Sequence, residues 1–466
     1  MKIKILNQLN KIIKKNYTRF HMPGHKGRSM YKFDWYKYDF TEVAGSDNLS
    51  NPEGIINEVL NDISKIYDTH KSYILVNGST VGIISSLLAV CKPEESFIIP
   101  RNSHRSVYSA LILNNIVPVY LQPNYDHKYT YPVSIDPFEV EKVFIENPLC
   151  KGIIITSPTY YGTCSDINKI SQITKKYSKI LIVDEAHGAH LKFNNNYPIS
   201  AVEQGADIVI QSTHKHLNSF TQTGILHVCN ESIDLSEISK YINMLQSSSP
   251  SYPMMISIEM AVKHAYTKGK GILDNIIYYY DMIEKELEDT PFTMIGSDII
   301  NNKEVYDYDK SKIWINSLIS GKLLDRILRE NYNIQVEMSD NNSILGMMGM
   351  GTKEKDVTIL IRALKEIAED MKYNKYNNSK KINMKYPITE SRMIPWETMK
   401  YTKRKIDIQE AKNKIAGDFI IPYPPGVPLI IPGEIINEEV LEYLMNFDKK
   451  DIVGVSESNL ISILDA

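Results

Sequence analysis

The stretch "KILIVDEAH", Lys179 to His187, has the pattern of a buried strand that ends in polar residues. Its four apolar residues follow one another without alternation, which is typical of a strand covered on both faces in a parallel sheet. The polar "DEAH" begins where this strand should end, and ligand sites of open α/β sheets gather beyond the carboxyl ends of the strands. The stretch therefore predicts a fold class and the place of a site.

Further runs of the same kind lie between about residues 70 and 230, with helical patterns among them. They read "SYILVNGS", "SFIIP", "IVPVYL", "GIIITSP", "ADIVIQST" and "GILHVC". Strands rich in Ile and Val that alternate with helices indicate a largely parallel sheet covered by helices on both faces. We therefore expect an α/β protein whose chemistry lies in the polar residues that follow the strands.

The composition is that of an ordinary globular protein. The chain has 466 residues, of which 43% are hydrophobic and 23% charged, enough for two or three domains with a sizeable core. A net charge of −3 gives no electrostatic reason to expect nucleic acid or an anionic membrane as a partner. Its four cysteines lack CxxC pairing, which argues against a disulfide framework and a structural zinc site.

The amino-terminal stretch is basic, with apolar residues at helical spacing, but it lacks the apolar core and cleavage site of a signal peptide. We interpret it as a docking helix. No apolar run approaches the ~20 residues that a membrane span needs. These features predict a soluble cytoplasmic protein.

Composition also suggests a division into domains. We expect an N-terminal arm or helix over 1–45, a large domain over 46–265, a small α/β domain over 266–375 and a C-terminal domain over 376–466. The charged, Asn-rich stretch over 366–386 is typical of an exposed connection before the last domain. That domain contains "IIPYPPGVPLIIPGE", whose prolines and Gly426 predict a rigid extended turn.

The "NGST" stretch, Asn77 to Thr80, lies between an expected strand and an expected helix. Gly78 lets the backbone approach a ligand closely, and Ser79, Thr80 and the first helix amides would point donors at one place. This arrangement is suited to a phosphate. A plain helix cap explains a Ser-Thr pair equally well, so the motif carries little weight alone.

The "DEAH" stretch has three interpretations. It spells the acidic box of a helicase ATPase, but the chain lacks the GxxxxGK[ST] loop that this chemistry needs. His187 and His190, with His214 and His216, could bind a metal, yet their spacing matches no strong ligand pattern, and we expect no metal site. The third interpretation places the Asp184 carboxylate against a cationic ring nitrogen.

The stretch "QSTHKHLNSFTQTG", Gln211 to Gly224, supplies the reason to expect such a ring. Lys215 follows an apolar strand and is flanked by hydroxyl and imidazole groups, which suits covalent attachment to pyridoxal phosphate. The carboxylate of Asp184 would keep the pyridine nitrogen protonated. The alternative is a surface lysine, but the combination of Gly78, Ser79 and Thr80 with Asp184 and Lys215 is far more specific than any member alone.

The chain resembles the bacterial ornithine/lysine/arginine decarboxylases in their short, arginine decarboxylase-like form. Five stretches carry the likeness: "RFHMPGHKG", "LVNGSTVG", "VDEAHGAH", "STHKHLNSFTQTG" and "IIPYPPGVPLIIPGE". The resemblance spans nearly the whole chain. It implies the aspartate-aminotransferase-like fold of pyridoxal phosphate enzymes, fold type I, with a mostly parallel seven-stranded sheet and smaller α+β parts toward the C-terminus.

The resemblance also implies roles for single residues. Lys215 would be the covalent anchor, Asp184 the partner of the pyridine nitrogen, and His104 the ring stacked on the cofactor. The remaining cofactor-binding residues would be Gly78, Ser79, Thr80, Ala186, His187, Ser212, His214 and, from the neighbouring subunit of a homodimer, Ser248. Glu434 would hold the distal cation of the substrate.

The expected activity is the decarboxylation of a basic amino acid, with arginine favoured over lysine and ornithine, as a supply of amine for polyamine biosynthesis. One departure affects the substrate: Trp396 stands where the family commonly has an arginine, and the nearby Arg392 could substitute for it. Two alternatives stay open. One is an aminotransferase or another lyase on the same fold, because the cofactor residues are shared. The other is a catalytically silent binding protein.

Overall fold

The computed structural model describes residues 13–28, 34–126, 128–129, 131–300, 304–373, 386–423 and 426–465. The side chain of residue 297 is outside this description. Most of the expected N-terminal helix and the central part of the expected exposed connection lie outside the described residues. None of the described helices is long and apolar enough to cross a membrane.

A seven-stranded sheet forms the large domain, with the strand order β2-β11-β10-β9-β7-β3-β4. Only β11 runs antiparallel to its neighbours. The seven strands are β2 (Lys71–Leu75), β3 (Ser96–Pro100), β4 (Val117–Leu121), β7 (Gly152–Thr156), β9 (Ile180–Asp184), β10 (Ile208–Gln211) and β11 (Gly224–Val228). All seven apolar runs of the sequence become these strands, so the expected fold class is confirmed.

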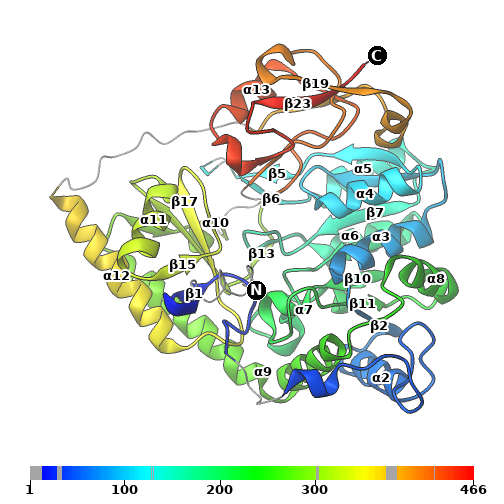
Figure 1. Ribbon diagram of the computed structural model, residues 1–466, viewed down its shortest axis with the longest axis horizontal. Helices are drawn as coiled ribbons and strands as arrows, with labels where there is room; N and C mark the ends of the chain where they lie inside the picture. Colours follow the sequence, from blue (N-terminus) through cyan, green and yellow to red (C-terminus); the bar gives the residue numbers. More distant parts are fainter. Residues whose placement is uncertain are drawn as a thin grey trace, which may run out of the picture.

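Helices cover both faces of this sheet (Figure 1). They are α2 (Ile55–Tyr67), α3 (Gly78–Val90), α4 (Arg105–Leu113), α5 (Pro137–Glu146), α6 (Ile167–Lys176), α7 (Thr213–His216) and α8 (Leu235–Leu245). One apolar core packs α3, α4 and α8 against the sheet, and another packs α5 and α6 against the opposite face. The sheet is thus buried on both sides, as its continuous apolar strands require.

The small domain has a four-stranded sheet in the order β12-β14-β17-β16. Its elements are β12 (Phe292–Met294), α10 (Ile295–Ile299), β14 (Lys312–Ser317), α11 (Gly321–Asn331), β15 (Ile334–Val336), β16 (Met338–Ser339), β17 (Ser343–Met347) and α12 (Glu354–Lys372). The N-terminal strand β1 (Thr18–Phe20) pairs in parallel with β15, which ties residues 18–28 to this domain. Two short pairs complete the middle of the chain, β5 (Asn124–Tyr125) with β6 (Pro132–Ser134) and β8 (Thr163–Cys164) with β13 (Asp307–Tyr308).

The helix α9 (Tyr252–Leu287) joins the large and small domains. It contacts α2 in the first domain and lies beside α12 in the second (Figure 1). The domain boundary expected at residue 265 would cut this helix, and the four domain ranges expected from the sequence stay a proposal.

In Figure 1 the C-terminal domain lies above the large domain, on the side of α4 and α5. It is built from short antiparallel pairs, namely β18 (Glu390–Ser391) with β21 (Glu434–Ile435), β19 (Lys403–Asp407) with β23 (Leu460–Leu464), and β20 (Ile421–Pro422) with β22 (Ile452–Val453). The helix α13 (Glu438–Leu444) packs on their own apolar core.

Candidate active site

A cavity of about 250 Å³ lies beyond the carboxyl ends of the central strands, between the large and C-terminal domains. Residues from the ends of β7 and β9 and from the starts of α3 and α4 line it, together with parts of the C-terminal domain. The expected site residues among its lining are Ser79, His104, Asp184, Ala186, His187 and Lys215. Side chains more than 130 residues apart in the sequence therefore meet where the strand pattern placed them.

Lys215 lies in the single turn α7, directly after β10. Its Nζ is 3.0 Å from Nε2 of His187. Burial lowers the pKa of Lys215, and the nearby Asp184 carboxylate opposes this shift. A larger fraction of free amine is therefore present near neutral pH than for an exposed lysine, and the free amine is the nucleophilic form.

Asp184 is the last residue of β9 and is buried. Its Oδ1 accepts a hydrogen bond from the backbone N–H of Ala186 at 3.1 Å. Burial raises the pKa of this carboxyl, while Lys215 and the Ala186 amide pull it back. A cationic ring nitrogen would supply the buried carboxylate with the charge partner that favours its ionised form.

His104 caps the N-terminus of α4, and its ring lines the cavity. Its Nδ1 accepts from the Ser106 backbone N–H at 3.2 Å and lies 2.8 Å from the Ser106 hydroxyl. Desolvation, with the positive charge of Lys215 as a smaller cause, lowers the pKa of His104 to about 4. The ring is thus neutral at physiological pH and held in one orientation, which suits stacking on an aromatic cofactor.

The residues expected to hold a phosphate lie around the N-terminus of α3, although of these only Ser79 lines the cavity. Gly78 begins this helix, and the Ser212 hydroxyl donates to the Ser79 hydroxyl at 2.9 Å. His214 lies close by in the sequence, with Nδ1 2.9 Å from the carbonyl oxygen of Thr223. Thr80 is exposed and does not line the cavity, so its role stays a prediction.

A pyridoxal phosphate fits this donor set. The first amides of α3 and the paired hydroxyls of Ser79 and Ser212 offer an anion site. Lys215 offers the amine, and Asp184 offers a buried carboxylate that lacks a fixed cationic partner within bonding distance in the described part of the chain.

One functional group of the site was not expected from the sequence. The Nζ of Lys312, a fully buried residue of β14, lies 2.8 Å from Nδ1 of His187. The His187 ring therefore bridges two lysines, and it packs against the Tyr160 ring with centroids 4.7 Å apart. The sequence shows only a lysine at the start of the apolar run "KIWINS", and the burial of every position of this strand appears only in the structure.

Glu434, expected to hold the distal cation of the substrate, lies in an ion pair between two domains, and its expected role stays a prediction. The residue is buried, is not part of the cavity lining, and its Oε2 is 3.2 Å from the Nη2 atom of Arg101. The Thr389 hydroxyl and the Ile431 backbone N–H also donate to it, at 2.7 and 2.8 Å. A carboxylate with these partners is already neutralised, and it joins the C-terminal domain to the end of β3.

Two other expected residues lie away from the cavity of their own chain. Ser248 is exposed in the segment between α8 and α9. Arg392 is exposed too, with its backbone N–H bonded to the Gly433 carbonyl at 2.9 Å. Neither belongs to the cavity lining, and Trp396 is instead covered by the Lys400 ammonium, 4.2 Å from the ring centroid.

Behind His187 lies a buried polar cluster of His190, His216 and Asp309, whose ligand-type atoms are within 4.8 Å of one another. The two imidazole rings are stacked, with centroids 4.3 Å apart and planes 19° from parallel. Ring nitrogens bind a metal in the plane of the ring, so nearly parallel planes do not converge on one ion. Instead, Oδ1 of Asp309 lies 3.1 Å from Nε2 of His190, and the Ser311 hydroxyl lies 2.9 Å from Nε2 of His216. We interpret the cluster as a hydrogen-bond network.

Comparison with known proteins places the chain in a family. Residues 5–317 match the model of the Orn/Lys/Arg decarboxylase major domain, and residues 371–452 match that of the Orn/Lys/Arg decarboxylase C-terminal domain. The chain belongs to the Orn/Lys/Arg decarboxylase family. Membership confirms the expected class of enzyme, an amino-acid decarboxylase with the fold of pyridoxal phosphate enzymes.

Individual relatives agree with this assignment. An arginine decarboxylase of Bacillus anthracis is 31% identical over 92% of this chain and 90% of its own length. An arginine decarboxylase of Bacillus subtilis is 30% identical over 94% of this chain and 91% of its own length. The solved structure of lysine decarboxylase A from Pseudomonas aeruginosa has a TM-score of 0.79 at 16% identity, covering 99% of this chain and 82% of that chain.

Proposed function

We propose that this member of the family binds pyridoxal phosphate and decarboxylates a basic amino acid, with arginine as the first candidate and lysine and ornithine next. The observation that carries the proposal is the placement of the Lys215 amine and the buried Asp184 carboxylate on the same cavity as the N-terminus of α3. The choice of arginine rests on the two Bacillus relatives named above. The product amine would supply polyamine biosynthesis.

The bound cofactor would supply an electron sink for the electrons left at Cα when carbon dioxide departs. Lys215 would hold the cofactor covalently and later offer a proton to Cα. Asp184 would keep the ring nitrogen protonated through a charge-assisted hydrogen bond. The neutral His104 ring would pack on the cofactor face, while Ser79, Ser212 and the α3 amides hold its phosphate.

The cavity lining suggests which residues would contact the distal cation of the substrate. Asp184 is the only carboxylate among the residues lining the cavity, in the described part of the chain, and the cofactor would engage it. Tyr160, Tyr161 and Tyr423 line the cavity with aromatic faces that suit a guanidinium or ammonium group.

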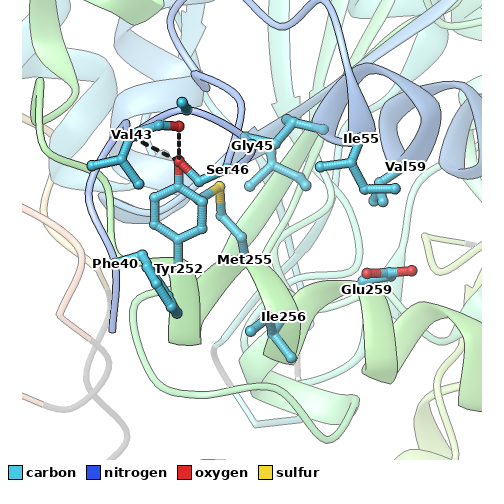
Figure 2. A pocket seen from close by; sticks show the side chains of 13 residues that line it. Phe40, Val43, Gly45, Ser46, Ile55, Val59, Tyr252, Met255, Ile256 and Glu259 are labelled. Atoms are coloured by element: carbon cyan, nitrogen blue, oxygen red, sulfur yellow. Dashed lines mark hydrogen bonds between the residues drawn. The ribbon is translucent and has the colours of Figure 1, made fainter. Parts of the chain in front are cut away.

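A homodimer would complete the site. Ser248 is exposed and lies away from its own cavity, which suits a residue that reaches the site of a neighbour. An apolar hollow of about 430 Å³ lies close by along the chain, lined by Phe40, Val43, Ile55 and Tyr252 among others (Figure 2). Phe40, Val43 and Ile55 are each more than half exposed, and such a patch is typical of a surface that a second copy covers.

Turnover of arginine, lysine and ornithine by the purified protein with added pyridoxal phosphate tests the proposal. We expect release of carbon dioxide and the matching amine, fastest with arginine, and no keto acid. Lys215→Ala should abolish both turnover and the visible absorbance of the bound cofactor, whereas Lys310→Ala, which alters a half-buried lysine that pairs with Asp281, should change neither. Keto acid without carbon dioxide would identify an aminotransferase instead.

A further inference from the structure

Lys312 is a charged side chain in a place where charge is costly. It begins β14, exposes none of its surface and comes from the small domain rather than from the large one. Gly162 makes room for it: this glycine has a φ of +103°, and a Cβ there would lie 2.6 Å from Cγ of Lys312. The lysine stem therefore runs over a position that only glycine fits, toward the ring of His187.

The two hydrogen bonds of the His187 ring prevent Lys215 and Lys312 from both being protonated. Burial, with the charges of Lys215 and Lys312, holds the pKa of His187 well below its ordinary value, so the ring is neutral. A neutral imidazole has one N–H donor and one acceptor nitrogen, and an ammonium can only donate. While both contacts persist, at least one of the two lysines must therefore be a free amine.

Each lysine has its own carboxylate neighbour that favours its charged form, Asp309 for Lys312 and Asp184 for Lys215. Burial lowers the pKa of Lys312 to about 7, and the Asp309 carboxylate is the strongest opposing influence. Asp309 bonds His190 at 3.1 Å and the Ser311 backbone N–H at 2.9 Å. The other titratable groups that lie near Lys312 or near the His187 ring are Lys215, Glu337, Lys26, His104, His214 and His216.

We propose that Lys312 is a positioning residue that acts through His187 on Lys215. As an ammonium it donates to Nδ1 of His187, which leaves the ring proton on Nε2. That N–H then points at Lys215 Nζ, which accepts it with its lone pair and is thereby held as the free amine. The inference deepens the proposed function, because a free amine at Lys215 is the form that attaches the cofactor.

The test measures the protonation of Lys215 itself in the full-length chain before cofactor is added. Trace amounts of acetic anhydride acetylate only free amines, and mass spectrometry of peptides gives the reactivity of each lysine across a pH series. Lys312→Met keeps the length and apolar stem of the side chain but removes the amine. We expect the reactivity midpoint of Lys215 to move to higher pH in this variant, because Nε2 of His187 is then free to accept a hydrogen bond from a Lys215 ammonium and so to stabilise its charged form.

Two controls separate this effect from general damage and from simple charge removal. Lys310→Met removes a half-buried lysine two positions away, which pairs with Asp281, and should leave the midpoint unchanged. In a His187→Phe background, Lys312→Met should move the midpoint much less than it does in the wild type. An equal shift in both backgrounds would overturn the route through His187, and an unchanged midpoint in Lys312→Met alone would overturn the proposal.

Lys312→Arg is the second variant, in case Lys312→Met fails to fold. Arginine can donate but never becomes neutral, so Lys215 should keep its low midpoint. A rise in the midpoint of a folded Lys312→Arg protein would contradict the proposal. Because acetylation requires no turnover, these outcomes are distinguishable from a failure of the proposed decarboxylation.

Discussion

Arg101 and Glu434 form an ion pair between two domains, with Nη2 of the arginine 3.2 Å from Oε2 of the glutamate. Both side chains are almost completely buried. Arg101 also donates a hydrogen bond to the Leu429 carbonyl at 3.1 Å. Leu429 lies in the same proline-rich segment as Tyr423 and Val427, which line the cavity. The pair therefore fixes the wall that the C-terminal domain contributes to the cavity.

The first prediction concerns this pair. Glu434→Gln should lower the free energy of unfolding by ~3–5 kcal/mol, because it leaves a buried guanidinium without its counter-charge. In Arg101→Met combined with Glu434→Gln the loss should be much smaller than the sum of the single losses. Urea unfolding measures both values.

Glu438→Gln is the matched control, because it breaks the exposed pair of Lys412 and Glu438, whose atoms are 2.7 Å apart. Exposed pairs contribute little, so stability should hardly change. A Glu434→Gln protein of unaltered stability that bound basic amino acids more weakly would support Glu434 as a substrate residue.

The second prediction concerns Asp184. Asp184→Asn keeps the shape of the side chain but removes its charge, so turnover should fall by ~10- to 100-fold, the equivalent of a charge-assisted hydrogen bond of ~1.5–3 kcal/mol. Cofactor affinity and carbon dioxide release should be measured together. Asp234→Asn, in the exposed cap of α8, is the control and should leave both intact. Full activity in Asp184→Asn would exclude the carboxylate as partner of the ring nitrogen.

The third prediction concerns acid stability. Burial lowers the pKa of His227 to about 3, so this histidine stays neutral in the folded chain while it takes up a proton on unfolding below about pH 6.5. The unfolded state then binds more protons, and the free energy of unfolding should fall as pH decreases from 6.5 toward 3. His104 and His214, each with a pKa lowered to about 4, add to the slope.

Urea unfolding between neutral and mildly acidic pH tests this slope. His227→Phe should reduce it by up to ~1.4 kcal/mol per pH unit, the contribution of one proton. His70→Phe, which changes an exposed histidine, should leave it as it is. A slope that His227→Phe does not reduce would mean that His227 is protonated in the folded protein.

The fourth prediction concerns the apolar hollow of Figure 2. Ile55 is 55% exposed at the first turn of α2, where an acidic residue is favourable to the helix. Ile55→Asp should therefore keep the fold but weaken dimerisation at least ~10-fold, since it places a charge in the interface. Analytical ultracentrifugation measures the dissociation constant. Leu149→Asp, at an 86% exposed residue elsewhere, is the control, and equal dimerisation of both variants would place the interface on another surface.

The strand pattern predicted the large domain and the part of the site that it carries. Ser79, His104 and Lys215 follow strands and Asp184 ends one. Because the ends of parallel strands share one edge, their sequence positions determine where they meet. The approach of Lys312 could not be predicted this way. It depends on how the small domain packs against "TYYGTC", where the missing Cβ of Gly162 opens the path.

The ion pair of Glu434 could not be predicted for a related reason. The resemblance to the decarboxylase family implied Glu434 as a partner of the substrate, whereas in the structure it pairs with Arg101, more than 300 residues away. No local pattern links the two residues, because their contact exists only once the C-terminal domain is in place. The buried arginine in "RNSH" was visible in the sequence, yet nothing there indicated burial.

Gly24 has a consequence for how the chain can be divided. Its N–H bonds the His214 carbonyl at 2.8 Å, its own carbonyl accepts from Gly351, and a Cβ on it would lie 2.6 Å from the His216 carbonyl oxygen. The turn that carries Lys215 is thus held between the start of the chain and the small domain. We therefore expect the large domain, cut out alone by protease or by gene truncation, to lose the geometry around Lys215 even if its sheet still forms, because the site is not a detachable module.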